Sequence, residues 1–205
     1  MRPVLLAILM SCPLWASQAL AGPVSTNLVA NGSFERLALP NQTLAQGGWD
    51  IYNSIEGWNG NIEVRNNASG STPFGKYFVE LDTTSNSSIW QMLNTVAGQR
   101  YELSFSYAQR PDHKGQASNG LCWQIGDMPC NAFGQDSKTG WTTLSTSFVA
   151  QGAQTRLSFG ALGSSDSYGT SLDNVSVNAV PEPASLALAL AGLATCAGFS
   201  RRRKA

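Results

Sequence analysis

Short stretches of alternating apolar and polar residues recur between positions 22 and 179 of the chain. The clearest is Arg100–Ala108, where aromatic and aliphatic side chains occupy every second position, as in a strand with one buried face. Similar runs between Gly, Asn and Ser turns predict strands at Tyr77–Leu81, Ile89–Leu93, Trp141–Val149, Thr155–Ala161 and Ser171–Val177, with weaker candidates at Leu28–Val29 with Ser33–Glu35, Ile62–Arg65 and Leu121–Ile125. No stretch of this region keeps a 3.6-residue apolar period, so the pattern predicts an all-β jelly-roll sandwich.

The apolar pattern changes at both ends of the chain. Residues 1–21 combine an early Arg, an apolar run and a final Ala-Leu-Ala, which predicts a secretory signal peptide cleaved between Ala21 and Gly22. Residues 184–200 carry no charge and are followed by the basic tail 201–204, which predicts a short transmembrane helix with its tail in the cytoplasm. A C-terminal helix packed on the domain is the alternative.

A proline-rich break stands directly before this apolar span. Pro181-Glu182-Pro183 cannot continue a helix or a central strand. Together with the span and the basic end, segment 180–205 resembles the PEP-CTERM sorting signal of exported bacterial proteins. The resemblance implies that Pro181, Glu182 and Pro183 are recognised by exosortase, a membrane protease that cuts nearby. We therefore expect the domain at 22–179 to be exported, anchored in the membrane, and then located at the cell surface or outside the cell.

Charge and cysteine content narrow the possibilities for the domain. Residues 22–180 contain eight Lys and Arg against twelve Asp and Glu, and this acidic balance argues against binding of nucleic acid. Only Cys122 and Cys130 lie outside the two terminal signals. A turn at Gly126-Asp127 places them opposite each other on a hairpin, which in an oxidising compartment predicts a disulfide. A metal site there is the poorer interpretation, because the domain has a single histidine.

Several motifs occur in a characteristic order along the domain. They are NLVANGSFE at 27–35, YFVEL at 77–81, RYELSFSY at 100–107 and GTSLDNVSV at 169–177. In this order they resemble the galactose-binding-like β-sandwich modules, especially a plant cell-wall and bacterial exported family catalogued as a domain of unknown function. More distantly they are similar to carbohydrate-binding modules. The resemblance implies a structural calcium between the first and last strands, with Glu35 and Asp173 as ligands; hydrogen bonds to turn amides are the alternative role for both.

The domain also has the side chains that a sugar site requires. Aromatic rings stack on the apolar face of a pyranose, while planar polar groups bind its hydroxyls. The Gly-rich connection 39–55 carries Trp49 and Tyr52, which we expect to be exposed, whereas Trp58 and Trp90 are expected in the core. A second cluster of candidates follows the strand predicted at Arg100–Ala108. It comprises Arg110, Asp112, His113, Asn119 and Trp123.

Catalytic machinery is not evident in this pattern. The domain has no G-x-S-x-G motif, and the spacing of Glu63, Glu80, Asp82 and Glu102 does not mark a pair of glycosidase carboxylates. The alternation places Glu80 and Glu102 on the solvent side of their strands. The sequence thus favours a non-catalytic module that binds extracellular polysaccharide. A structural matrix or surface-coat protein acting through protein contacts or self-association is the alternative, and a glycan hydrolase a minor one.

Overall fold

Ten strands and one short 3-10 helix make up the described part of the computed structural model, which comprises residues 26–113, 117–133 and 140–181. The elements are β1 (Trp49–Ile55), β2 (Trp58–Arg65), β3 (Phe78–Glu80), β4 (Ser88–Asn94), β5 (Arg100–Ala108), η1 (Pro111–His113), β6 (Gly120–Ile125), β7 (Asn131–Phe133), β8 (Thr142–Val149), β9 (Gln154–Leu162) and β10 (Ser171–Ala179). The all-β prediction is therefore confirmed.

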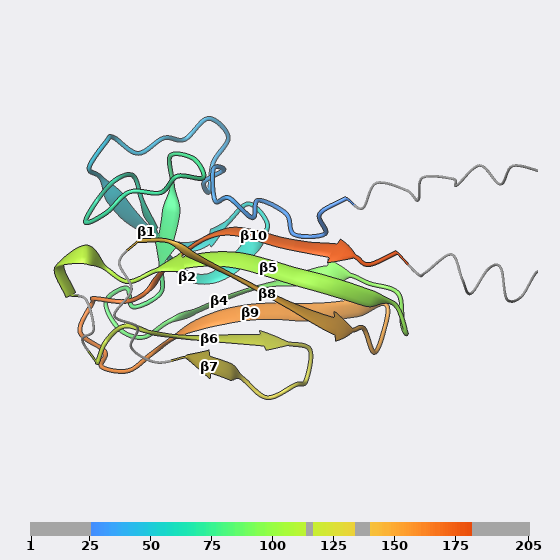
Figure 1. Cartoon of the computed structure of the whole chain (residues 1–205). Coiled ribbons are helices and arrows are strands. Elements are labelled where there is room, and N and C mark those ends of the chain that lie inside the picture. The colour runs from blue at the N-terminus through green and yellow to red at the C-terminus, as the bar shows by residue number, and fades with distance from the viewer. Residues whose placement is uncertain (1–25, 114–116, 134–139, 182–205) are drawn as a thin grey trace, which may run out of the picture.

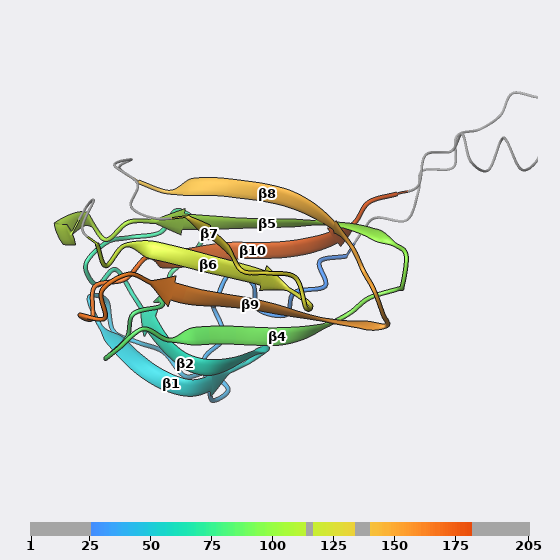
Figure 2. The same cartoon turned by 90° about the horizontal axis from the view of Figure 1, so that it is seen from below.

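The strands form one antiparallel sheet that is curled into two facing layers (Figures 1 and 2). Its order is β7-β6-β9-β4-β2-β3-β10-β5-β8, with β1 paired to β2. One layer holds β7, β6, β9 and β4, and the other holds β3, β10, β5 and β8. Phe105 of β5 packs across the space between them against Phe159 of β9 and Trp123 of β6, with ring centroids 5.0 and 5.5 Å apart.

Strand β2 connects the two layers. Its first half pairs with β4 through Asn59 and Gly60, and its second half pairs with β3 through residues 63–65. Gly60 adopts a φ of +121°, and a β-carbon there would lie 2.1 Å from the carbonyl oxygen of Ser88. Glycine is required at this crossing because any side chain would collide with the neighbouring strand.

The core between the layers explains the alternation seen in the sequence. Side chains at alternate positions of β5, β9 and β10 point inward and are almost completely buried, as are Trp58 and Phe34. Burial of such apolar surface supplies most of the folding free energy, at roughly 25 cal/mol per Å². Trp58 is therefore in the core as predicted. Trp90 instead lies half-buried on the outer face of β4, with the guanidinium of Arg156 over its ring at 4.4 Å, so its prediction as a core residue was wrong.

Three parts of the secondary structure differ from the sequence prediction. Strand β1 lies in the connection 39–55, which was expected to be a loop, and β7 lies outside every predicted strand. Residues 28–35 form turns instead of strand pieces. In β1 the register shifts between Tyr52 and Ser54, so apolar residues do not fall on one regular face. Such a bulge removes the two-residue period by which the other strands were recognised.

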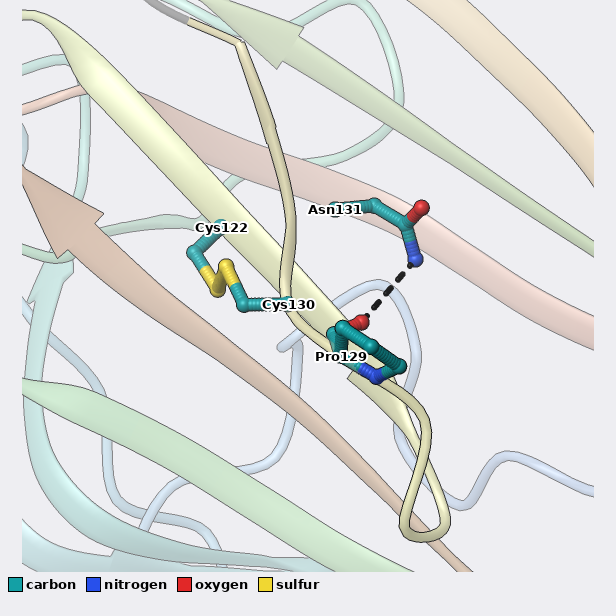
Figure 3. The surroundings of a disulfide bond; sticks show 4 residues. All are labelled: Cys122, Pro129, Cys130 and Asn131. Atoms are coloured by element: carbon teal, nitrogen blue, oxygen red, sulfur yellow. Dashed lines mark hydrogen bonds between the residues drawn. A yellow bond between two sulfur atoms is a disulfide. The ribbon is translucent and has the colours of Figure 1, made fainter.

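A disulfide links Cys122 of β6 to Cys130, just before β7, and confirms the predicted pairing (Figure 3). The two α-carbons are 5.7 Å apart. Pairing of β6 with β7 begins at Trp123 and Asn131, so the bridge closes the hairpin next to its turn. The disulfide therefore fastens β7, an edge strand, to the rest of the sheet.

Both ends of the described chain leave the sandwich on the same side (Figure 1). The amide of Leu28 donates to the carbonyl of Val177 near the end of β10, and the side chain of Gln99 donates to the carbonyl of Val180. Across residues 26–113, 117–133 and 140–181 there is no helix long and apolar enough to span a membrane. The predicted signal peptide with its Ala21–Gly22 cleavage site, Glu182 and Pro183, the transmembrane span and the basic tail lie outside the described residues.

Candidate functional site

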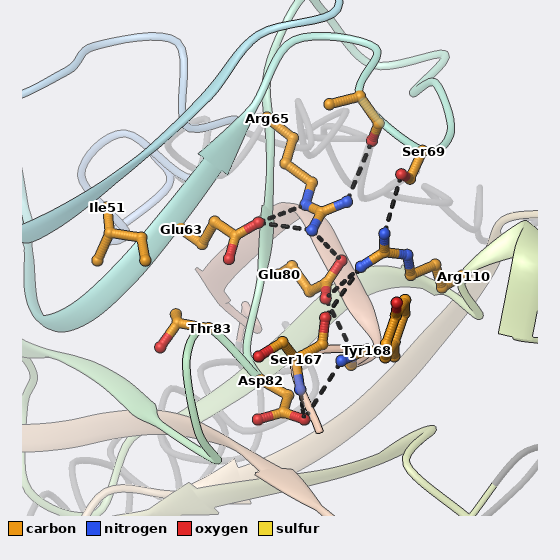
Figure 4. Close-up of polar contacts among 12 residues, drawn as sticks. Ile51, Glu63, Arg65, Ser69, Glu80, Asp82, Thr83, Arg110, Ser167 and Tyr168 are labelled. Atoms are coloured by element: carbon orange, nitrogen blue, oxygen red, sulfur yellow. Dashed lines mark hydrogen bonds and ion pairs between the residues drawn. The ribbon is translucent and has the colours of Figure 1, made fainter. Parts of the chain in front are cut away.

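A buried network of ion pairs lies at the end of the sandwich opposite the two termini (Figures 1 and 4). Arg65 contacts Glu63 at 2.6 Å and Glu80 at 3.1 Å, and Arg110 contacts Glu80 at 3.3 Å. Arg110 also contacts Asp112 at 2.9 Å. Glu80 is fully buried, so its predicted position on the solvent side of the strand was wrong. Strand β3 is buried on both faces, and on the face away from the core it is covered by polar side chains.

Strand register explains why two arginines are needed here. Glu63 of β2 and Glu80 of β3 are direct cross-strand partners, an arrangement that is destabilising for like charges. Burial raises the pKa of Glu80 to about 7 and also raises the pKa of Glu63, while Arg65 and Arg110 oppose both shifts. The guanidinium groups thus stabilise charges that the interior would otherwise disfavour.

Glu80 and the nearby Asp82 fix the loop between β9 and β10. One oxygen of Asp82 accepts hydrogen bonds from the backbone amides of Asp166, Ser167 and Tyr168, at 2.8, 2.9 and 3.3 Å. Glu80 accepts from the amide of Gly169 at 2.9 Å. Because buried carboxylates hold four successive amides, this loop has a defined shape rather than that of a freely mobile surface loop.

Above the network lies an open hollow of about 280 Å³. Its lining comprises Trp49, Ile51, Glu63, Arg65, Ser69, Thr83, Thr84, Arg110, Asp166, Ser167 and Tyr168. Trp49 and Ile51 belong to β1 and pair with Arg65 and Glu63 of β2, so they extend the same rows of side chains. Trp49 is 57% exposed, and the guanidinium of Arg110 lies 4.4 Å from the ring centre of Tyr168. The hollow therefore combines aromatic surface with fixed polar groups.

The structure unites residues that the sequence analysis kept in two groups. Trp49 from the first predicted cluster and Arg110 from the second line the same hollow. Asp112 pairs with Arg110, and the side-chain oxygen of Asn119 accepts the backbone amide of Arg110 at 3.3 Å. Asn119 is itself buried, so it supports the position of Arg110 and is not exposed to a ligand.

Two other candidates do not reach the hollow. Tyr52 is buried in the core and its hydroxyl accepts a hydrogen bond from Gln42, so the expectation of an exposed ring was wrong. Trp123 packs against Phe105 at the edge of the core. His113 is the last residue of η1, and its side chain is not among those described.

Sequence reasoning missed Tyr168, Arg65 and Asp166. Tyr168 lies in the polar segment GSSDSYGT, and an aromatic residue between Ser and Gly was the one available signal of an exposed ring. Arg65 was predicted to end a strand, and nothing in the sequence indicated that its charge is buried. Their roles follow from the meeting of β2, β3 and the β9–β10 loop.

Glu35, just after the turn at residues 29–33, and Asp173 of β10 do not line the hollow. One oxygen of Glu35 accepts the backbone amides of Lys76 and Tyr77. Asp173 is fully buried and accepts hydrogen bonds from the Thr72 hydroxyl and its neighbouring amide. Burial raises the pKa of Asp173 to about 7, and the charge of Glu35 adds to the effect. Both carboxyl groups thus accept backbone amides, and the described residues contain no group of three or more acidic, histidine or cysteine side chains that could hold a metal ion.

Comparison with known families agrees with the motifs. Residues 27–178 match the family described as "Protein of unknown function (DUF642)", and residues 179–204 match the PEP-CTERM protein-sorting motif. The chain therefore belongs to the DUF642 family and carries a PEP-CTERM sorting motif, as the sequence analysis predicted. No curated protein matches the sequence.

Solved structures with a similar strand arrangement include modules described as carbohydrate-binding. A family 61 module in complex with β-1,4-galactotriose has 15% identity and a TM-score of 0.45, with 75% of this chain and 98% of that one covered. A family 16 module has 12% identity and a TM-score of 0.45, with coverages of 74% and 99%. An arabinose-bound α-L-arabinofuranosidase has 14% identity and a TM-score of 0.49, and the match covers 75% of this chain but 26% of the enzyme.

Proposed function

We propose that this protein is an exported, non-catalytic module that binds polysaccharide in the hollow of Trp49 and Tyr168. The observation that carries the proposal is an exposed tryptophan beside a rigid, charged floor in a hollow large enough for a sugar ring. Aromatic rings supply stacking surface, and carboxyl groups that are already held in place bind hydroxyls without a further ordering cost. The acidic balance of the domain supports a ligand other than nucleic acid.

The position of the sorting motif supports a role at the cell surface. The hollow lies next to the start of β10, and Pro181 of the motif follows the end of that strand. Nine extended residues span roughly 30 Å at 3.3 Å per residue. A module anchored through its C-terminal segment, before exosortase processing, would present the hollow away from the membrane.

A non-enzymatic role is supported by how the acidic groups of the hollow are used. Glycoside hydrolysis requires two carboxyl groups that face the substrate across a gap. Glu80 is fully buried beneath two arginines, and Glu63 is held by Arg65 at 2.6 Å. These ion pairs suit a fixed binding surface better than transfer of a proton to a leaving group.

Substitution of Trp49 tests the proposed function. Trp49→Ala should weaken binding to the producing cell's exopolysaccharide by about five- to thirtyfold, since loss of a stacking ring costs roughly 1–2 kcal/mol. Affinity electrophoresis or calorimetry measures the change. Trp90→Ala, which removes a half-buried ring from the outer face of β4, is the matched control and should bind normally. Equal loss in both variants, or no binding by the unaltered protein, would contradict the proposal; self-association without sugar binding would favour a matrix protein.

We further propose that Glu35 and Asp173 hold a structural calcium ion, with other oxygens from backbone carbonyls and water. Calcium would replace the proton that burial favours on Asp173. Added calcium should therefore raise the melting temperature, and more strongly above pH 7 than at pH 5. Differential scanning fluorimetry with calcium or a chelator measures the shift. The same shift in Asp173→Asn would show that calcium binds elsewhere.

A further inference from the structure

The charged donors of the hollow are already engaged. Each nitrogen of Arg65 contacts an acceptor: Nε and Nη2 contact Glu63, Nη2 also contacts Glu80, and Nη1 donates to the carbonyl of Ala68. Arg110 is used in the same way. Its Nε contacts Asp112, its Nη1 contacts Glu80 and the carbonyl of Ser167, and its Nη2 donates to Ser69. Each guanidinium thus has four of its five N–H groups in these contacts, which leaves few donors for an anionic ligand.

The negative groups outnumber the positive groups around the hollow. Glu63 and Asp166 line it, and Glu80, Asp82 and Asp112 are bonded directly to its lining residues. Among the described lining residues, the cations are the two arginines alone. Five carboxyl groups against two guanidinium groups leave a local excess of negative charge wherever Glu63 and Glu80 are ionised. The exposed charge of Asp166 adds to this excess at the rim.

We infer that the hollow accepts a neutral, hydroxyl-rich sugar and discriminates against sugars that carry carboxylate, sulfate or phosphate. This inference rests on the proposed function and specifies its ligand class. Hydroxyl groups can donate hydrogen bonds to the carboxylate oxygens that face the hollow, whereas an anionic substituent would meet like charges with every guanidinium nitrogen in use. Unpaired like charges at a binding site are a recognised source of selectivity.

Pairs of glycans that differ only in charge test the inference. Carboxyl reduction converts polygalacturonan and mannuronan to neutral chains with the same linkages. We expect the unaltered protein to bind the neutral member of a pair at least about tenfold more tightly at low ionic strength. The difference should shrink as salt is added, because screening acts over about 10 Å at 0.1 M. Equal or tighter binding of the acidic member would overturn the inference and leave the proposed function intact. Failure to bind any neutral or acidic glycan would overturn both.

A charge variant separates the local field of the hollow from the net charge of the protein. Asp166→Asn keeps an acceptor for the amide of Tyr168 but removes one negative charge from the rim. It should narrow the preference for the neutral glycan by about threefold. Asp127→Asn makes the same charge change in the exposed turn after β6, outside the hollow, and should leave the preference unchanged. Equal effects of the two variants would overturn the local origin of the selectivity.

Discussion

Arginine lies over an aromatic ring in two regions of this protein, and in both the guanidinium carbon is 4.4 Å from the ring centre. At the end hollow, Arg110 over Tyr168 is also held by ion pairs and hydrogen bonds from four other residues. On the outer face of the layer that contains β4 and β9, Arg156 over Trp90 is an exposed side chain on a regular strand. Arg110 is thus fixed over its ring by other partners, whereas Arg156 lies over its ring on an exposed strand face.

The difference lies in what stabilises each region. The end hollow depends on buried charge, since three strands and a loop meet around Glu80. The outer face depends on strand pairing and the disulfide of Cys122, whose side chain lies beside Gly160 and Arg156 there. Buried ion pairs fix geometry but are vulnerable to loss of one partner, whereas a disulfide mainly constrains the unfolded chain. The two regions should therefore respond to different perturbations.

The largest difference is expected when one arginine is removed from each region. Arg65→Ala leaves Glu63 and Glu80 buried without their shared partner, which should lower the free energy of unfolding by about 3–5 kcal/mol. Arg156→Ala removes an exposed side chain and should lower it by less than about 1 kcal/mol. Urea unfolding measures both. If Arg65→Ala does not fold, Arg65→Lys should give an intermediate loss, because it keeps the charge but not the forked geometry. Equal stability of the two alanine variants would contradict the comparison.

Removal of the disulfide comes next in size. The double variant Cys122→Ser with Cys130→Ser should be less stable by about 2–3 kcal/mol, since it frees a short loop in the unfolded chain. The end hollow should keep its glycan affinity, because it contains neither cysteine. Chemical unfolding and calorimetric titration on the same sample measure the two quantities. A fall in affinity as large as that of Trp49→Ala would show that the two regions are coupled.

An effect of similar size is expected from pH. The pKa of Glu80 is raised in the folded state to about 7, so this group favours folding below pH 4.5 and the contribution is lost as the pH rises through 7. Glu80→Gln should remove a pH dependence of about 2–3 kcal/mol from the unfolding free energy between pH 5 and 8. Unfolding curves from pH 5 to 8 measure the slope. An unchanged slope in the variant would assign the pH dependence to other groups, of which Asp173 is the first to test.

Much of the scaffold could be predicted because it depends on local pattern. The alternation in Arg100–Ala108 marked a strand with one buried face, and β5 has those bounds. The spacing of Cys122 and Cys130 around a Gly-Asp turn was sufficient to predict their bond. Strand β1 escaped detection because its bulge interrupts the alternation, and Tyr52 was misplaced with it.

The candidate site was predicted only in part. Trp49 and Arg110 were named from their residue types and loop-like surroundings, but nothing in the sequence indicated that they line one hollow. Their meeting depends on the pairing of β1 with β2, β2 with β3, β3 with β10 and β10 with β5. Tyr168 is held there by amides bonded to Asp82, which is 86 positions away in the sequence.

The sequence by itself determined that this chain is an all-β domain with a disulfide hairpin and a sorting motif. These features follow from residue type and from short spacings along the chain, which do not depend on the tertiary structure. The tertiary structure alone decided that Glu80 is buried, that two arginines compensate it, and that an aromatic hollow lies above them. Alternation shows that a strand has two faces, but whether a face meets water, core or a charged partner depends on strands distant in the chain.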